Sequence, residues 1–251
     1  MSGQWRMAGD LIMDVSIDET YPRPGMRAEW SRIAAIVWKD LTMERRAKAN
    51  FNSVAFLAAL ILLMFAFAIG PDAETLRNAA GGAIWLTVLF SGVLSFNRAY
   101  EQELEGGSLD MLVLYPGDRR AIYVGKLIAN LTFLLLVEAI LLVVAGVLYD
   151  LPLLGIALPL SLVVFLGTLG FVALGTFYAA MASRLRAREV LLPLLLFPML
   201  IPLLIASVEA TNDLLSGSAM GNVGGWMRLL LVFDVIFVAA SVMAFEYVIE
   251  D

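Results

Sequence analysis

Long apolar stretches, separated by short segments rich in charged residues, glycine or proline, run through most of the chain. A helix that crosses a bilayer core of about 30 Å needs roughly 20 residues at 1.5 Å each. Six segments meet this requirement to within a few residues at each end: 52–69, 79–96, 121–148, 155–181, 190–208 and 228–247. The pattern therefore predicts an all-α, polytopic membrane protein with six transmembrane helices.

The region ahead of the first span falls into two parts. Residues 1–25 contain Pro22 and Pro24 but no apolar run long enough for a signal peptide, so we interpret them as a mobile cytoplasmic tail ahead of the membrane domain, residues 26–251. Residues 27–49 alternate apolar and basic sides at helical spacing, which predicts an amphipathic helix in the cytoplasmic interface or, alternatively, on a partner. Its apolar positions are Trp30, Ile33, Ile36, Val37 and Leu41.

Composition narrows the chemistry. The chain has 251 residues, of which 61% are hydrophobic and 16% charged, and its mean hydropathy is +0.84. Ordinary soluble domains have roughly 45–50% apolar and about 25% charged residues, which excludes a single soluble domain. Without cysteine or histidine, the chain cannot form a disulfide, a thiolate nucleophile, a Cys/His zinc site or a Ser-His-Asp triad. We expect a lipid environment and no nucleic-acid partner.

The basic residues indicate an orientation. If the N-terminus is cytoplasmic, all of the 17 lysines and arginines except Arg77 and Arg228 lie on the cytoplasmic side. This asymmetry is the positive-inside pattern of membrane proteins. An even number of spans then places the C-terminus in the cytoplasm as well.

The connection between the second and third spans, residues 98–126, is the most informative cytoplasmic segment. Its first half is acidic, a glycine pair interrupts the helix leaving the second span, and Ser108 can cap a new short helix that a proline ends. Leucines give this short helix an apolar face. The positions that we assign to coupling with a partner are Glu101, Glu103, Glu105, Gly106, Gly107, Leu109, Asp110, Leu112 and Pro116.

A short helix with an apolar face needs a surface that covers it. The cytoplasmic leaflet is negatively charged and repels carboxylates, so the acidic flanks favour a groove on a soluble partner over the membrane surface. A solvated loop with incidental glycines is the alternative. We expect a cytoplasmic coupling helix that docks on a partner, with the glycine pair as a hinge.

The sequence EQELEGGSLDMLVLYPGDRRAIYVGK at 101–126 resembles the coupling segment of type-2 ABC exporter permeases. More narrowly, the chain is similar to the B-subunit permeases of the cytochrome c maturation system, the haem exporter protein B family. This similarity includes residues 39–71, 125–142 and the proline-rich stretch 191–211, and it covers about residues 27–250.

The resemblance implies a function and a set of partners. It implies a permease of the bacterial cytoplasmic (inner) membrane that couples ATP hydrolysis on a separate ABC ATPase subunit to haem delivery or release at the outer face. The implied partners are that ATPase, a haem-handling C subunit, a small accessory membrane subunit and a second permease copy. Two alternatives stay open: a mechanical relay subunit that transports nothing, and a type-2 exporter permease for a lipid, glycan or drug.

The chain lacks the parts for ATP chemistry. The phosphate-binding pattern G-x-x-x-x-G-K-[ST] is absent, because Gly125 and Lys126 are followed by Leu127. We therefore expect ATP on the partner and no enzymatic activity on this chain. The commonest axial ligands of haem, histidine and cysteine, are absent, so we expect no bound cofactor or metal here and any haem on a partner subunit.

Polar residues inside a membrane span are costly and point to a function or to helix contacts. The candidates are Asn130, Glu138 and Asp234. They could line a path, contact a neighbouring subunit or satisfy one another. Asp234 follows Arg228 by six residues, so we place it near the outer end of the sixth span, where it would be solvated.

Prolines and small residues add local expectations. Pro193, Pro198 and Pro202 predict that the fifth span is a poor continuous helix, either kinked beside a water-accessible seam or statically bent. Residues 210–225 predict a short re-entrant or surface segment on the outer face. Close helix packing is indicated by four small residues of the fourth span, Gly167, Gly170, Ala173 and Gly175.

Overall fold

The structure, a computed structural model, describes residues 26–46, 48–105, 119–182, 188–217 and 220–250. In this part of the chain the regular elements are all helices. They are α1 (Met26–Arg46), α2 (Lys48–Ile69), α3 (Ala73–Glu105), α5 (Arg119–Leu148), the short 3-10 helix η1 (Leu153–Ile156), α6 (Ala157–Ala182), α7 (Arg188–Leu215) and α8 (Met220–Glu250).

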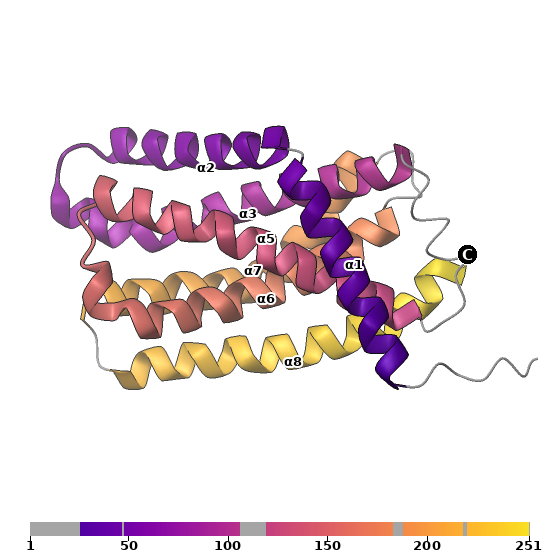
Figure 1. The fold of residues 1–251 in the computed structure, drawn as a ribbon. Helices are drawn as coiled ribbons and strands as arrows, with labels where there is room; N and C mark the ends of the chain where they lie inside the picture. Colours follow the sequence, from indigo (N-terminus) through magenta and orange to yellow (C-terminus); the bar gives the residue numbers. More distant parts are fainter. Residues whose placement is uncertain (1–25, 47, 106–118, 183–187, 218–219, 251) are drawn as a thin grey trace, which may run out of the picture.

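Helices α2, α3 and α5 to α8 form a bundle, and α1 crosses this bundle at one end (Figure 1). We call that end the α1 end; the C-terminal part of α8 lies there too. The opposite end, which we call the far end, holds the connections from α2 to α3, from α5 to α6 and from α7 to α8. The far end carries only Arg77 and Arg228 among the described basic residues, and the others lie toward the α1 end.

The prediction of six spans is confirmed, since six of the described helices are long and apolar enough to cross a membrane. Three spans differ from their predicted bounds by more than a few residues at one end, and they cover Ala73–Arg98, Pro193–Leu215 and Gly221–Phe245. The re-entrant or surface segment predicted at 210–225 is wrong, because α7 and α8 take up most of it. Hydropathy underestimated these helices because their end turns are polar or glycine-rich, although they still form helical hydrogen bonds.

The beginning of α3 shows how such a polar turn is stabilised. The Thr75 amide donates a hydrogen bond of 2.9 Å to Asp72 Oδ2, and the Thr75 hydroxyl donates to the same oxygen. This is an N-cap, which satisfies one of the free amides of the first turn. The hydrogen bonds from the Thr75 hydroxyl and amide hold the pKa of Asp72 below its usual value.

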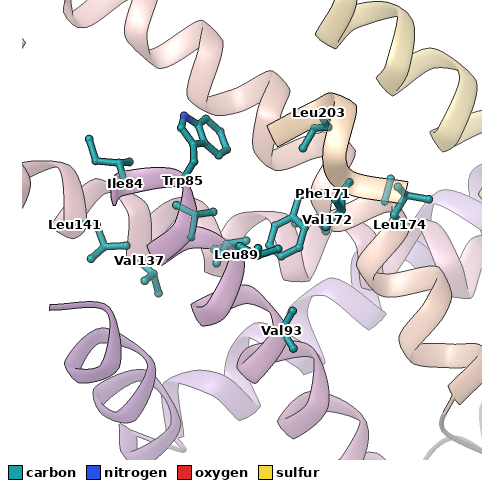
Figure 2. Close-up of a cluster of buried hydrophobic side chains, with 14 of the residues drawn as sticks. Ile84, Trp85, Leu89, Val93, Val137, Leu141, Phe171, Val172, Leu174 and Leu203 are labelled. Atoms are coloured by element: carbon teal, nitrogen blue, oxygen red, sulfur yellow. The ribbon is translucent and has the colours of Figure 1, made fainter. Parts of the chain in front are cut away.

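Helix α3 is the most enclosed of the spans and contacts α2, α5, α6 and α7. Figure 2 shows Trp85, Leu89 and Val93 of α3 within a cluster that includes side chains of α5 and α6. Apolar burial gives little driving force between helices in lipid, so close packing must hold them together. The position of α3 therefore makes it the central element of the bundle.

The small residues of α6 provide this close packing, as the sequence predicted. A Cβ atom built on Gly167 would lie 2.2 Å from the Trp85 ring of α3, and one built on Gly175 would lie 2.1 Å from the Phe96 ring. Both distances are far below van der Waals contact. A larger residue at either position would push α6 away from α3.

Helix α7 continues through all three prolines and is not interrupted there, whereas the predicted kink or bend stays a prediction. Pro198 and Pro202 lie on the exposed side of α7. Their rings therefore need no space between packed helices. A membrane helix tolerates proline when local adjustments satisfy the carbonyls that lose their donors.

Helix α1 is present where the amphipathic pattern predicted a helix, and it packs mainly on α5 of the same chain. Ile36 is buried against Gly125, on which a Cβ atom would lie 2.8 Å from the Ile36 side chain. Trp30 and Trp38 remain exposed, at 63% and 74% of their surface. The predicted contact of this apolar side with the membrane interface or with a partner stays a prediction.

Candidate functional site

Two polar pairs join α5 to α6 inside the bundle. The Thr168 hydroxyl lies 2.8 Å and 2.7 Å from the two carboxyl oxygens of Glu138, and Asn130 Nδ2 donates to Thr176 Oγ1 at 3.0 Å. The members of the two pairs are eight residues apart on each helix, as antiparallel packing requires. Asn130 and Glu138 therefore bond to α6 and not to each other. We call these the α5–α6 polar pairs.

Asp234 is buried, with 3% of its surface exposed, so its predicted position near a solvated outer end is wrong. The sixth span begins at Gly221 and not near Arg228, which puts Asp234 close to the middle of Gly221–Phe245. Neither of its carboxyl oxygens has a hydrogen-bond partner among the described residues. It is therefore an isolated acidic group at the centre of a membrane span.

A glycine of α6 makes room for this carboxyl group. A Cβ atom built on Gly170 would lie 2.5 Å from Asp234 Oδ1 and 2.3 Å from Leu203 Cδ1 of α7. Gly170 thus allows α7 and α8 to approach α6 at the depth of Asp234. The close-packing role predicted for Gly170 includes a direct contact with one of the predicted polar residues.

A row of polar side chains on α7 leads from this region toward the far end. The row consists of Ser207, Thr211 and Asn212, and we call it the α7 row. Trp85 Nε1 of α3 donates to Thr211 Oγ1 at 2.9 Å, and the Gly81 amide donates to Asn212 Oδ1 at 3.1 Å. Ser207 Oγ is fully buried and has no hydrogen-bond partner among the described residues.

The α7 row ends at an open cleft of about 720 Å³ at the far end, between the beginning of α3 and the end of α7. Arg77 in this cleft donates from Nη2 to Asp150 Oδ2 at 2.8 Å and from Nε to the Asp150 carbonyl at 3.0 Å. That ion pair offsets the charge of Arg77, and the other charged lining residues, Glu74 and Asp213, are acidic. The lining residues are Ala73, Glu74, Arg77, Asn78, Asn212, Asp213, Leu215 and Ser216.

The predicted coupling positions fall mostly outside this description. Gly106, Gly107, Leu109, Asp110, Leu112 and Pro116 lie outside the described residues. Glu101, Glu103 and Glu105 belong to the last turns of α3, although their side chains are not among those described. Helices α3 and α5 bound this segment at the α1 end of the bundle.

The arrangement offers helix contacts and proton-binding groups more readily than a cofactor site. Within the described ranges, no group of three or more acidic side chains could hold a metal ion. Of the buried acidic groups, Glu138 is paired with Thr168, whereas Asp234 has no hydrogen-bond partner among the described residues. Such groups can bind protons or water.

The sequence of most of the chain matches a family model. The model described as "CcmB protein" matches residues 31–250, and these residues include all six spans. The chain belongs to the CcmB family. This match covers the whole helical bundle and not just the coupling segment on which the first resemblance rested.

Individual relatives agree with the family match. A protein named heme exporter protein B from Paracoccus denitrificans is 33% identical over 179 residues, which are 71% of this chain and 81% of the relative. The protein of the same name from Rhodobacter capsulatus is 31% identical over 190 residues, covering 74% and 85%. That from Haemophilus influenzae is 31% identical over 170 residues, covering 68% and 76%.

Sequence reasoning did not select the partners of the polar candidates. Thr168 and Thr176 have the same spacing of eight residues as Asn130 and Glu138, and this equality could have identified the α5–α6 polar pairs. Ser207 and Thr211 stand one helical turn apart in an apolar span. Small hydroxyl side chains carry a weak hydropathy signal, so they do not stand out as charged residues do.

Proposed function

We propose that this chain is the membrane permease subunit of a haem exporter complex that acts in cytochrome c maturation, driven by an ABC ATPase on a separate subunit. The observation that carries the proposal is membership of the CcmB family over 31–250, with relatives named heme exporter protein B along most of their length. The six-helix bundle supplies the membrane part of such a complex. No catalysis is assigned to this chain.

The position of α3 supports coupling to an ATPase. The membrane span of this helix ends at Arg98, but α3 continues to Glu105, about 10 Å further at 1.5 Å per residue. Residues 106–118 therefore follow a helix that is also the central element of the bundle. A displacement of this segment would move α3, and the contacts of α3 with α2, α5, α6 and α7 would carry the movement through the bundle.

The proposed complex has further parts. The ATPase binds the leucine face of Leu109 and Leu112, two permease copies face an ATPase dimer, and a haem-handling C subunit and a small accessory subunit complete the assembly. Haem stays with the C subunit or passes at a shared boundary. The chain lies in the bacterial inner membrane with both termini in the cytoplasm, as the charge asymmetry favours.

A mechanical relay that moves no substrate through this chain is the second candidate. The α7 row occupies only the half of α7 that lies toward the far end. Toward the α1 end, Leu196, Leu200 and Leu203 of α7 are fully buried. This apolar half favours either a relay or a path shared with a partner over a polar channel inside one copy.

Co-purification from the native membrane tests ATPase binding. The variant Leu109→Asp/Leu112→Asp places two charges on the proposed docking face and should lose the ATPase subunit, while the membrane partners remain. Leu185→Asp is the control, because it adds one charge to a different connection at the α1 end, between α6 and α7, and should retain the ATPase. Equal recovery of the ATPase with all three chains would contradict docking at this face.

The hinge is tested separately. Gly106→Ala/Gly107→Ala should leave the ATPase bound but lower ATP-driven haem release by the assembled complex, since alanine restricts the backbone at the hinge. Unchanged haem release with this variant would remove the hinge from the proposal and leave ATPase docking intact.

A further inference from the structure

Two buried polar side chains on neighbouring helices share an unusual property. Asp234 of α8 and Ser207 of α7 are at most 3% exposed, and no described residue hydrogen-bonds to the Asp234 carboxyl group or to Ser207 Oγ. Buried polar groups in proteins nearly always have a partner, either from the protein or from ordered water. Water is the partner that remains for these two groups.

Both groups lie over the same face of α6. A Cβ atom built on Gly167 would lie 2.6 Å from Ser207 Oγ, and one built on Gly170 would lie 2.5 Å from Asp234 Oδ1. Side chains three residues apart on a helix are neighbours, with Cβ atoms about 5–6 Å apart. Ser207 Oγ and the Asp234 carboxyl group therefore face one seam where α6 meets α7, bounded by the Trp85 ring of α3 at Gly167 and by α8 at Gly170, and a short chain of water molecules would join them.

Among the described residues of α7, the polar groups closest to this seam lie toward the far end. Thr211 follows Ser207 by one turn and accepts a hydrogen bond from Trp85 Nε1, and Asn212 lines the cleft. Toward the α1 end, Leu203 closes the seam beside Gly170. The next polar side chain on α8 in that direction, Ser241, lies two turns away and hydrogen-bonds to Tyr123.

No described cation donates a hydrogen bond to Asp234. Among the titratable side chains of α5 and α6, Glu138 bonds to Thr168 on a different side of α6, and Tyr123 bonds to the Ala173 carbonyl. The acidic side chains of α7 near this seam, Glu209 and Asp213, belong to turns closer to the far end. Arg228 of α8 is exposed. An isolated carboxylate in hydrocarbon is costly, and a bound proton or water relieves that cost.

We propose that Asp234 is a proton-binding site at the middle of the membrane, which exchanges protons with the far-end cleft through water held by Ser207 and Thr211. Proton uptake converts the carboxylate to the acid, and proton release returns it to the water of the cleft. No other reactant takes part. The proposal goes beyond haem export, because it concerns a site that needs neither the ATPase nor haem.

Infrared spectroscopy of the full chain in lipid nanodiscs tests the proposal. A protonated carboxyl group has its own C=O stretching band, which shifts when deuterium replaces the proton. At neutral pH, we expect an acid band that is absent from Asp234→Asn, present in Glu138→Gln, and shifted soon after transfer to D₂O. The proposal would be overturned if the C=O stretching bands of protonated carboxyl groups were identical in the wild type and Asp234→Asn. It would also be overturned if the Asp234 band did not shift in D₂O.

The direction of access has its own controls. Ser207→Ala removes a proposed water ligand and should slow the deuterium shift of the Asp234 band about tenfold, as expected for the loss of one hydrogen-bonding group. Ser241→Ala makes the same change toward the α1 end and should leave the rate unchanged. A slower shift in Ser241→Ala, with a normal rate in Ser207→Ala, would contradict access from the far end.

Hydration of the seam is measured independently by using the absence of cysteine from the chain. Ser207→Cys and Ala206→Cys introduce one thiol at the same depth on two faces of α7, and both native side chains are fully buried. Silver ions are small enough to follow water, and they should modify Ser207→Cys at least about tenfold faster. Equal rates for the two thiols would show that the seam is dry and would overturn the proposal.

Discussion

Glu138 and Asp234 are acidic side chains of the same bundle that contact α6 only two residues apart, yet their surroundings differ. Glu138 meets a hydroxyl group, because Thr168 donates to its carboxyl oxygens. Asp234 meets Gly170, which provides space and no donor. A buried acidic residue can thus be a helix contact, as Glu138 is, or lack a partner among the described residues, as Asp234 does, and the facing residue of α6 accounts for the difference.

The largest expected effect comes from filling the space beside Asp234. Gly170→Val should lower the free energy of unfolding by about 3 kcal/mol, because the added atoms overlap the Asp234 carboxyl group and the Leu203 side chain. Unfolding in detergent measures this loss. Gly82→Val is the matched control: a Cβ atom at Gly82 meets nothing within 4 Å, so the same change should cost little there. Equal losses would show that Gly170 is not a special contact.

Removing the donor beside Glu138 should have the next largest effect. Thr168→Val keeps the shape of the side chain but leaves the buried Glu138 carboxyl without its partner, which should cost about 2 kcal/mol of unfolding free energy. In a Glu138→Leu background the same threonine change should cost almost nothing. A similar cost in both backgrounds would mean that the hydrogen bond does not stabilise the α5–α6 contact.

Replacing Asp234, the second acidic residue of the comparison, should have little effect on the free energy of unfolding. Asp234→Asn removes no hydrogen bond to a described residue, so it should not cause a loss of unfolding free energy as large as the loss expected for Thr168→Val. The same unfolding assay applies. A loss as large as that of Thr168→Val would reveal a partner for Asp234 and remove the contrast with Glu138.

Asp72 is an exposed carboxylate that serves as a reference. Its replacement should have the smallest effect on stability among these changes. Its folded pKa lies below the ordinary value of 3.8 because it accepts two hydrogen bonds from Thr75. Its contribution to stability is thus fully present above pH 3.8 and is lost as the pH falls through the lower folded pKa. The melting temperature of the wild type should exceed that of Asp72→Asn at neutral pH, and the difference should shrink in acid. A difference that does not depend on pH would contradict this cap.

Much of the fold could be predicted from the sequence, because each span must be a long apolar helix in lipid. The errors lie at polar helix ends. The cap at Asp72 begins α3 before its apolar part, and the glycine-rich start of α8 hid the first turns of the sixth span. The second error moved Asp234 from the middle of the membrane to its edge, and with it changed the expected environment of its side chain.

The polar candidates were visible in the sequence, but their partners were not. A charged residue in an apolar span stands out by itself, whereas the pairing of Glu138 with Thr168 depends on the register between two helices. The difference between Thr168 and Gly170 becomes important only when both acidic residues are placed around α6. Helix register is a property of packing, and hydropathy carries no information about it.

Purification of the full chain from its native membrane in mild detergent tests the central claim most directly, with mass spectrometry of the bound proteins and a haem absorbance spectrum. The account predicts that an ABC ATPase subunit and a haem-handling membrane subunit co-purify in fixed ratio, and that the haem absorbance follows the haem-handling subunit when the complex is dissociated. A stable, folded chain that binds no ATPase under conditions where other ABC complexes remain intact would contradict the claim that it is the permease of an ATP-driven haem exporter.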